Sequence, residues 1–145
     1  MPEIRFYETA QDAQLRYAVI IARSEGKWVF CKHRLRDTYE CPGGHREEGE
    51  DIFAAAHREL YEETGAQDYT LTPVCPYSVT DAEGTETFGM LFYAEISSFS
   101  ALPDYEMERV LLFDQLPESW TYPAIQPALL EHVRQWASNE ERLAL

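Results

Sequence analysis

The sequence predicts an α/β fold in which helices cover the faces of a mixed β-sheet. Two observations lead to this fold class. The predicted elements follow the order strands, helix, strands, helix, and each amphipathic element must bury its apolar side. The chain also has 145 residues with 45% hydrophobic content, which can form one core and is too short for two ordinary domains. We therefore expect a single domain over residues 1–145.

The first predicted elements form a β-hairpin. Residues 16–23 have the strand-like sequence RYAVIIAR, and a second strand is expected from residue 27 to about residue 32. The turn between them is Ser24-Glu25-Gly26. The hairpin leads toward a glycine-containing segment.

A helix is predicted next, between Asp51 and Gly65. Asp51 is a good N-cap, Gly65 is a good residue to follow the last turn, and no glycine or proline lies between them. We expect about three to four helical turns. Phe53, Ala56 and Leu60 share a stripe that should face the core.

The later elements are shorter strands and a second helix. Residues 69–79 form a strand whose Pro73 and Pro76 suggest an edge position or bulges. A polar loop covers residues 81–86, and strands are expected over residues 88–96 and 109–113. Residues 123–137 predict a helix, because apolar residues recur there at helical spacing: Ile125, Leu129, Val133 and Trp136.

Three carboxylates converge on the first helix, because Glu59 lies beside both Glu62 and Glu63 on one face. Like charges at this spacing destabilise an isolated helix by a few tenths of a kcal/mol per pair. Hard divalent cations favour carboxylate oxygens, and magnesium is held by one or two carboxylates together with waters and substrate phosphates. A magnesium-diphosphate site fits both observations, and a solvated acidic face is the alternative.

The segment before this helix offers backbone groups to a ligand. Gly43 and Gly44 follow Pro42, so the chain there can take unusual dihedral angles and approach a ligand closely. A backbone carbonyl could then serve as a ligand. The basic run over residues 32–36 could meet phosphates, or it could simply solubilise the end of a strand.

The residues from Gly44 to Ala66, GHREEGEDIFAAAHRELYEETGA, resemble the Nudix box. Every charged and glycine position of that signature is met, and Ala66 stands where the family usually has a larger aliphatic residue. The resemblance implies a Nudix α/β/α sandwich, with the mixed sheet between helices. It also implies a hydrolase that cuts a diphosphate linked to another group.

The resemblance also implies roles for single residues. The carbonyl of Gly44 and the carboxylates of Glu59 and Glu63 would bind the metal, which is expected to be Mg²⁺, with Mn²⁺ as an alternative. Glu62 would bind metal or help to activate water. Arg58 would make a structural contact with a glutamate that orients the loop, and the spacing allows Glu62 or Glu50 as that partner.

A further carboxylate is expected from the loop before residues 109–113. Glu106 is the first choice and Glu108 the second, and either could bind another metal ion or accept a proton from the attacking water. A solvated acidic loop is the alternative. The sequence leaves the general base open among Glu62, Glu106 and Glu108.

The expected reaction is hydrolysis of a nucleoside triphosphate to the monophosphate and pyrophosphate, as in small MutT-like members of the family, with 8-oxo-dGTP as one candidate substrate. ADP-ribose or another nucleoside diphosphate sugar, and a dinucleoside polyphosphate, are the alternative substrates. A non-catalytic Nudix-fold nucleotide sensor is the alternative of another class. Five aromatic residues could stack on a base or belong to the core: Tyr39, Phe88, Phe92, Trp120 and Tyr122.

Composition limits the partners. The formal net charge is −14, with no basic cluster large enough for a nucleic-acid polymer. Cys31, Cys41 and Cys75 are odd in number and widely spaced, which indicates neither a disulfide framework nor a zinc site and fits a reducing cytoplasm. No apolar run approaches the roughly twenty residues that cross a bilayer, so no membrane partner is expected. Monomer and homodimer both stay open.

Overall fold

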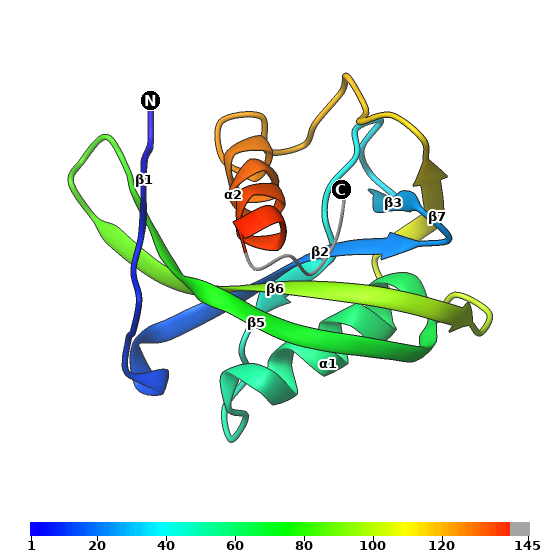
Figure 1. Ribbon diagram of the computed structural model, residues 1–145, viewed down its shortest axis with the longest axis horizontal. Helices are drawn as coiled ribbons and strands as arrows, with labels where there is room; N and C mark the ends of the chain where they lie inside the picture. The colour runs from blue at the N-terminus through cyan, green and yellow to red at the C-terminus, as the bar shows by residue number, and fades with distance from the viewer. Residues whose placement is uncertain (140–145) are drawn as a thin grey trace.

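The computed structural model describes residues 1–139, which form one mixed sheet with a helix on each side (Figure 1). This confirms the predicted fold class. The strands are β1 (Glu3–Phe6), β2 (Leu15–Ser24), β3 (Lys27–His33), β4 (Gly43–His45), β5 (Ala66–Thr80), β6 (Glu86–Phe99) and β7 (Met107–Phe113). The helices are α1 (Ile52–Thr64) and α2 (Gln126–Asn139), and a 3-10 turn covers Asp12–Gln14.

The strand order across the sheet is β1-β5-β6-β2-β3-β7, with β4 paired to β2. The β2–β6 pair is parallel, and the other pairs are antiparallel. The predicted bulge near the prolines of β5 is present, because the register with β6 shifts between Pro73 and Cys75. β5 and β6 form a long hairpin that crosses the whole molecule (Figure 1).

The β2–β3 hairpin opens beyond its turn. The two strands are in register only from Ala22 opposite Val29 to Ser24 opposite Lys27. Farther from the turn, β2 pairs with β4 instead, and residues 40–45 enter the gap. Cys31 of β3 exchanges both backbone hydrogen bonds with Glu40, at 2.8 and 3.0 Å. The glycine-containing segment is therefore held between two diverging strands.

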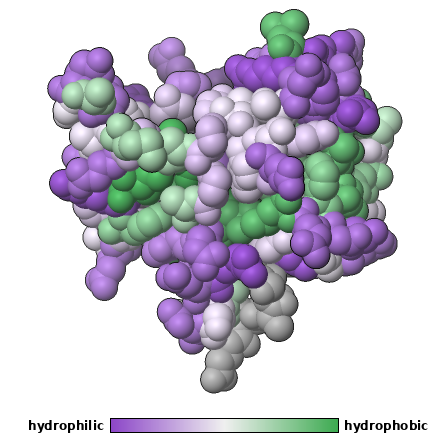
Figure 2. All heavy atoms as spheres, turned by 90° about the horizontal axis from the view of Figure 1, so that it is seen from above, coloured by the Kyte–Doolittle hydropathy of each residue, from purple (hydrophilic) through white to green (hydrophobic). Residues whose placement is uncertain are grey.

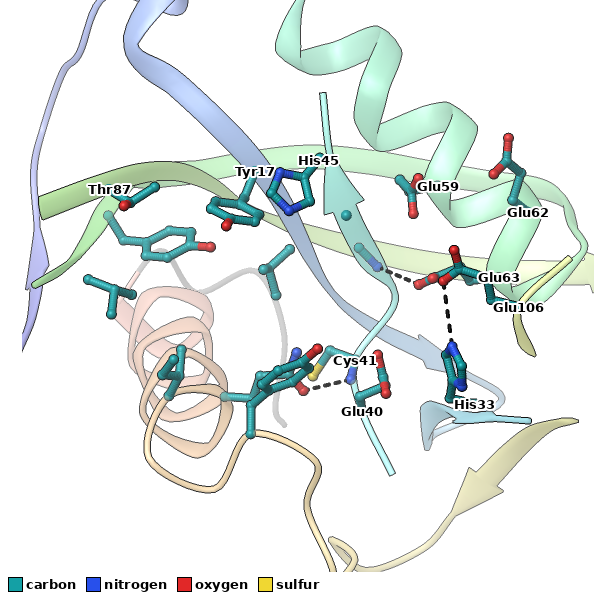
Figure 3. Close-up of a pocket in the computed structure, with 18 of the residues that line it drawn as sticks. Tyr17, His33, Glu40, Cys41, His45, Glu59, Glu62, Glu63, Thr87 and Glu106 are labelled. Carbon is teal, nitrogen blue, oxygen red and sulfur yellow. Dashed lines mark hydrogen bonds and ion pairs between the residues drawn. The ribbon is translucent and has the colours of Figure 1, made fainter. Parts of the chain in front are cut away.

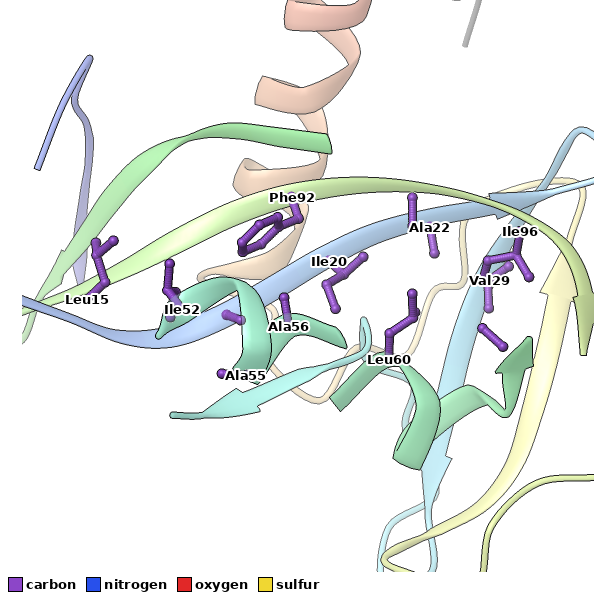
Figure 4. Close-up of a cluster of buried hydrophobic side chains, with 13 residues drawn as sticks. Leu15, Ile20, Ala22, Val29, Ile52, Ala55, Ala56, Leu60, Phe92 and Ile96 are labelled. Carbon is purple, nitrogen blue, oxygen red and sulfur yellow. The ribbon is translucent and has the colours of Figure 1, made fainter. Parts of the chain in front are cut away.

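The alternation of side chains along β2 divides the core between the two helices. Ala18, Ile20 and Ala22 pack with α1, as Figure 4 shows for the latter two. Ile21 and the half-buried Val19 point to the opposite face, where α2 packs. On the face seen from the α2 side, hydrophilic residues surround apolar ones (Figure 2).

The first helix begins and ends as predicted. The side chain of Asp51 accepts a 2.8 Å hydrogen bond from the Ala54 N–H, and Gly65 takes the left-handed conformation with φ 74°. The predicted core position of Phe53 is wrong, because its side chain is 43% exposed. The buried stripe is centred on Ile52, Ala55, Ala56, Leu60 and Glu63. Phe53 lies at its margin, where its ring makes a T-shaped contact with the ring of Phe92.

The second helix begins at Gln126, three residues later than predicted. The Tyr122 carbonyl accepts hydrogen bonds from the Ile125 and Gln126 N–H groups, so the intervening residues form a turn. The sequence prediction missed β1 and β4, which are four and three residues long. Within residues 1–139, neither helix has the length and apolarity required to cross a bilayer.

Candidate active site

A cavity of about 660 Å³ lies where α1, the segment 40–45, the turn end of the β5–β6 hairpin and the start of α2 meet (Figure 3). Its two ends differ in chemistry. One end is acidic and contains Glu40, Glu59, Glu62, Glu63 and Glu106. The other end combines aromatic and apolar residues with polar ones. The former are Tyr17, Val19, Tyr77, Val79 and Ile125, and the latter are Asp81, Thr85, Thr87 and Gln126.

Glu63 is the most deeply buried of the helix glutamates in the cavity wall, with 8% of its surface exposed. Its Oε1 accepts a 2.9 Å hydrogen bond from the Gly43 N–H. Burial raises the pKa of Glu63 to about 9. The hydrogen bond from Gly43 opposes this increase, and the carboxylates of Glu59, Glu40 and Glu106 add to it. An ionised Glu63 therefore needs a positive charge nearby.

Glu59 lies directly against Gly44. A Cβ atom at Gly44 would overlap the Glu59 carboxylate, with the carboxylate carbon only 2.5 Å away. A Cβ atom at Gly43 would overlap the carbonyl oxygen of Ala18 on β2. Gly43 therefore requires glycine because the backbone of β2 is too close, whereas a side chain at Gly44 would have to displace the Glu59 carboxylate. Burial raises the pKa of Glu59 as well, while its contact with Arg58 lowers it.

Arg58 joins the helix to the loop before it. Its Nε and Nη2 donate to the two carboxylate oxygens of Glu50, at 2.7 and 3.0 Å, and Nη2 also donates to the His45 carbonyl at 2.9 Å. The distance to Glu62 is longer, 3.6 Å. Glu50 is therefore the main partner of the two that the spacing allowed. Hydrogen bonding to Arg58 lowers the pKa of Glu50. Arg58 orients the loop and does not line the cavity.

Glu106 reaches the acidic end from the loop before β7, and its side chain is 74% exposed. Its carboxylate lies 3.7 Å from Nε2 of His33, and its backbone carbonyl accepts a 3.0 Å hydrogen bond from the Arg34 N–H. Glu108 points elsewhere, because it pairs with Lys32 at 3.2 Å and does not line the cavity. Of the two residues that the sequence suggested, Glu106 is therefore the one whose side chain lies at the acidic end of the cavity.

The basic run contributes only in part. His33 and Arg36 line the cavity. Lys32 pairs with Glu108, and Arg34 pairs with Asp104 on the neighbouring loop. Among the aromatic candidates, only Tyr122 lines the cavity. The rings of Tyr39, Phe88, Phe92 and Trp120 instead pack with the two cores.

Sequence reasoning missed several residues of the cavity wall. Glu40 is buried and pairs with Arg36 at 3.1 Å. Its position in the sequence, just before Gly43 and Gly44, could have indicated that it lies in the cavity wall. Tyr17 and Tyr77 occur within strands and gave no signal. Gln126 lies 85 residues from Cys41, its hydrogen-bond partner, so no local pattern could have found it.

The donor set fits a divalent metal ion that is also bound by a substrate. Glu59, Glu62, Glu63 and Glu106 offer hard oxygen donors around one end of the cavity. Within residues 1–139, no group of three or more His, Cys, Asp or Glu side chains forms a ready-made metal cage. Mg²⁺ keeps several waters and usually takes further ligands from substrate phosphates, so protein oxygens supply only part of its shell.

Known proteins are similar to this chain in sequence and in fold. The family model of the NUDIX domain matches residues 12–133. YtkD of Bacillus subtilis (strain 168), to which 8-oxo-dGTP diphosphatase activity is ascribed by name, is 35% identical over 105 residues. That match covers 72% of this chain and 65% of YtkD, so less than two thirds of the relative's length is spanned.

Solved structures show the same fold. The pyrophosphohydrolase BsRppH of Bacillus subtilis has a TM-score of 0.74 at 26% identity, covering 91% of this chain and 90% of its own. A MutT Nudix hydrolase from Burkholderia pseudomallei has a TM-score of 0.62 at 24% identity, covering 83% of this chain and 98% of its own. The fold, the acidic cavity and the match over residues 12–133 together show that this chain belongs to the Nudix family.

Proposed function

We propose that the chain is a Mg²⁺-dependent pyrophosphohydrolase that cleaves a nucleoside triphosphate to the monophosphate and pyrophosphate. One observation carries the proposal. The cavity joins an acidic end, suited to a metal-bound diphosphate, to an aromatic and apolar end, suited to a base. Its volume of about 660 Å³ lies within the range of small-molecule sites.

The chain's own residues would divide the work. Glu59 and Glu63, with the Gly44 carbonyl, would hold the metal ion, and Mn²⁺ would suit the same oxygen donors. When bound, the ion would neutralise charge on the phosphates and lower the pKa of water. Gly43 would keep Glu63 in place through its N–H. Arg58 would keep the preceding loop in register with the helix.

The proton of the attacking water would pass to a glutamate. Glu106 and Glu62 are the candidates, since both line the acidic end and neither is as buried as Glu63. The water oxygen would bond to phosphorus while the bond linking the α- and β-phosphates breaks, and pyrophosphate would leave. The protein supplies position and electrostatic stabilisation.

The relatives support a nucleotide substrate. YtkD carries the name of an 8-oxo-dGTP diphosphatase, which makes 8-oxo-dGTP the first specific candidate. A UDP-X diphosphatase and an ADP-ribose pyrophosphatase from Streptococcus suis match at 17% and 14% identity, which shows the shared fold alone. The net charge of −14 favours a small metal-bound nucleotide over a nucleic-acid polymer.

The test is a substrate panel of nucleoside triphosphates, 8-oxo-dGTP, ADP-ribose and a dinucleoside polyphosphate, with Mg²⁺ and with chelator. Pyrophosphate and orthophosphate release are measured separately. Chelator-sensitive release of pyrophosphate from a triphosphate is expected. Turnover of ADP-ribose or the dinucleotide alone would replace the substrate class. Tight nucleotide binding without turnover would favour a non-catalytic sensor.

Metal binding has a readout that is independent of turnover. Mg²⁺ should raise the thermal midpoint of the wild type, because a ligand of the folded state stabilises it by mass action. Glu59→Gln should reduce that shift. Glu131→Gln is the control, since Glu131 lies exposed on α2 and should leave the shift unchanged. An equal shift in all three proteins would remove Glu59 from the metal site.

A further inference from the structure

The Gln126 side chain is held in one orientation at the start of α2. Its Oε1 accepts a 2.8 Å hydrogen bond from the Cys41 N–H, and only the oxygen end of an amide can accept. The residue is 6% exposed. The amide therefore cannot flip without breaking a buried hydrogen bond. Its other end, Nε2, takes no part in the bond to Cys41.

That nitrogen faces the cavity. No residue among 1–139 accepts a hydrogen bond from Nε2 of Gln126, whereas every fully inaccessible side-chain nitrogen or oxygen in this range has a partner. Nε2 must therefore be open to a solvent-filled space, and Gln126 lines the cavity. A nearly buried amide thus keeps an N–H donor available for whatever occupies this end.

The surroundings suit a flat, largely apolar group. Tyr17, Val19, Tyr77 and Ile125 line the same end. The Tyr77 ring is fixed, because it is 4% exposed and lies over Gly89, where a Cβ atom would come within 2.6 Å of it. Aromatic and apolar walls of this kind accommodate a nucleobase.

The distance between Gln126 and the acidic end at Glu59 also suits the length of a nucleotide. Gln126 binds the Cys41 N–H, and Gly44 abuts Glu59 three residues farther along the same segment. Three residues of extended chain span roughly 10 Å. A sugar and its first phosphate can bridge such a gap, so a nucleotide with its diphosphate at Glu59 can place its base at Gln126.

We infer that Gln126 is a specificity-determining residue that selects nucleobases with a carbonyl oxygen, such as the 6-oxopurines, over bases with an exocyclic amine at the same position. The inference rests on the proposed function for the placement of the phosphates. A carbonyl oxygen of the base can accept a hydrogen bond from Nε2 of Gln126. An exocyclic amine of the base would instead place its own N–H donors against those of Nε2. A site built around a buried polar group discriminates strongly when that group is left unpaired.

The test compares two substrates that differ in this feature. ITP has a carbonyl at position 6 and ATP has an amine, while their sugars and triphosphates are identical. The wild type should prefer ITP in kcat/KM. Q126E keeps an oxygen for the Cys41 N–H and replaces the donor end by an acceptor, so the ITP/ATP ratio should fall at least about tenfold. General repulsion of phosphates cancels in this ratio.

Q135E is the matched control, because it makes the same change at an exposed position on the same helix. It should leave the ratio unchanged. A ratio that is equal in wild type and folded Q126E would overturn the inference and leave the proposed function standing. If Q126E does not fold, a wild type without preference for ITP would overturn it.

Binding separates failure of the inference from failure of the proposed function. The affinities of IMP and AMP are measured by calorimetry in chelator, where no hydrolysis occurs. If no triphosphate is hydrolysed but IMP binds more tightly than AMP, and Q126E removes that preference, the inference holds and the proposed function fails. Equal affinities for IMP and AMP would overturn the inference.

Discussion

The Gly43 N–H donates a 2.9 Å hydrogen bond to the Glu63 carboxylate, and this contact joins the segment between the diverging strands to the end of α1. One hydrogen bond does not compensate for burial of a charge. The pKa of Glu63 is raised to about 9 with burial as the main cause. A cation beside Glu63 would therefore favour its ionised form.

The variants Glu62→Gln and Glu63→Gln should lose most activity while staying folded, because each removes a carboxylate from the acidic end. A loss of at least about a hundredfold in kcat is expected, by analogy with removal of other electrostatic groups. Pyrophosphate release and a circular-dichroism melt are the two measurements. Retained turnover in a folded variant would contradict the assignment of that residue.

Glu63→Gln should also be more stable than the wild type in chelator. With its pKa raised to about 9, Glu63 takes up a proton on folding at neutral pH, which costs stability. The amide needs no proton and its oxygen can still accept from Gly43, so a gain of about 1–3 kcal/mol is expected. Urea unfolding at neutral pH measures it. Glu131→Gln on the surface should change stability by less than about 0.5 kcal/mol.

Arg58→Lys should be destabilising although it keeps the charge. Lysine cannot reproduce the two-pronged contact with Glu50 together with the bond to the His45 carbonyl. We expect a loss of about 1–3 kcal/mol and a parallel loss of activity, because the loop is no longer oriented. Arg134→Lys is the control, since Arg134 pairs at 3.6 Å with Glu131 and should cost about 0–0.5 kcal/mol. Equal effects would show that the Arg58 contacts contribute little.

Gly44→Ala should reduce activity at least about tenfold, because the new methyl group must displace the Glu59 carboxylate and a small misplacement of catalytic groups is costly. Gly26→Ala provides the comparison. Gly26 has φ 76° in the β2–β3 turn, so alanine there is strained by about 1 kcal/mol but lies outside the cavity wall. It should lower the thermal midpoint and leave kcat/KM unchanged. A fully active Gly44→Ala enzyme would contradict the predicted close contact.

Stability should fall in acid partly through Asp12. Its hydrogen bond with Arg46, followed by that with the Ile52 N–H, lowers the pKa of Asp12. A lowered pKa in the folded state means that the stabilisation is fully present above the ordinary aspartate pKa of about 3.9 and is lost as the pH falls through the folded-state value. Asp12→Asn should therefore flatten the dependence of urea midpoint on pH between about pH 5 and pH 2. Parallel curves for the two proteins would exclude this contribution.

Local sequence signals predicted the elements that local interactions stabilise. Asp51 and Gly65 mark the two ends of α1 because capping is decided within a few residues. The apolar runs of β2 and β3 gave the hairpin for the same reason. Phe53 was placed wrongly because a stripe on a helix can rotate by one position without changing its period, and only packing against β2 fixes it.

The sequence by itself determined the family signature, the order of elements and the set of carboxylates that face one another on a single helix. Only the tertiary structure decided which groups from distant segments join them. β4 pairs with β2 through only three residues, and the Glu106 side chain reaches the cavity from the loop before β7. The Gln126 amide accepts a hydrogen bond from Cys41, which is 85 residues away in the sequence. These contacts depend on the divergence of β2 and β3, and long-range packing of this kind leaves no periodic trace along the chain.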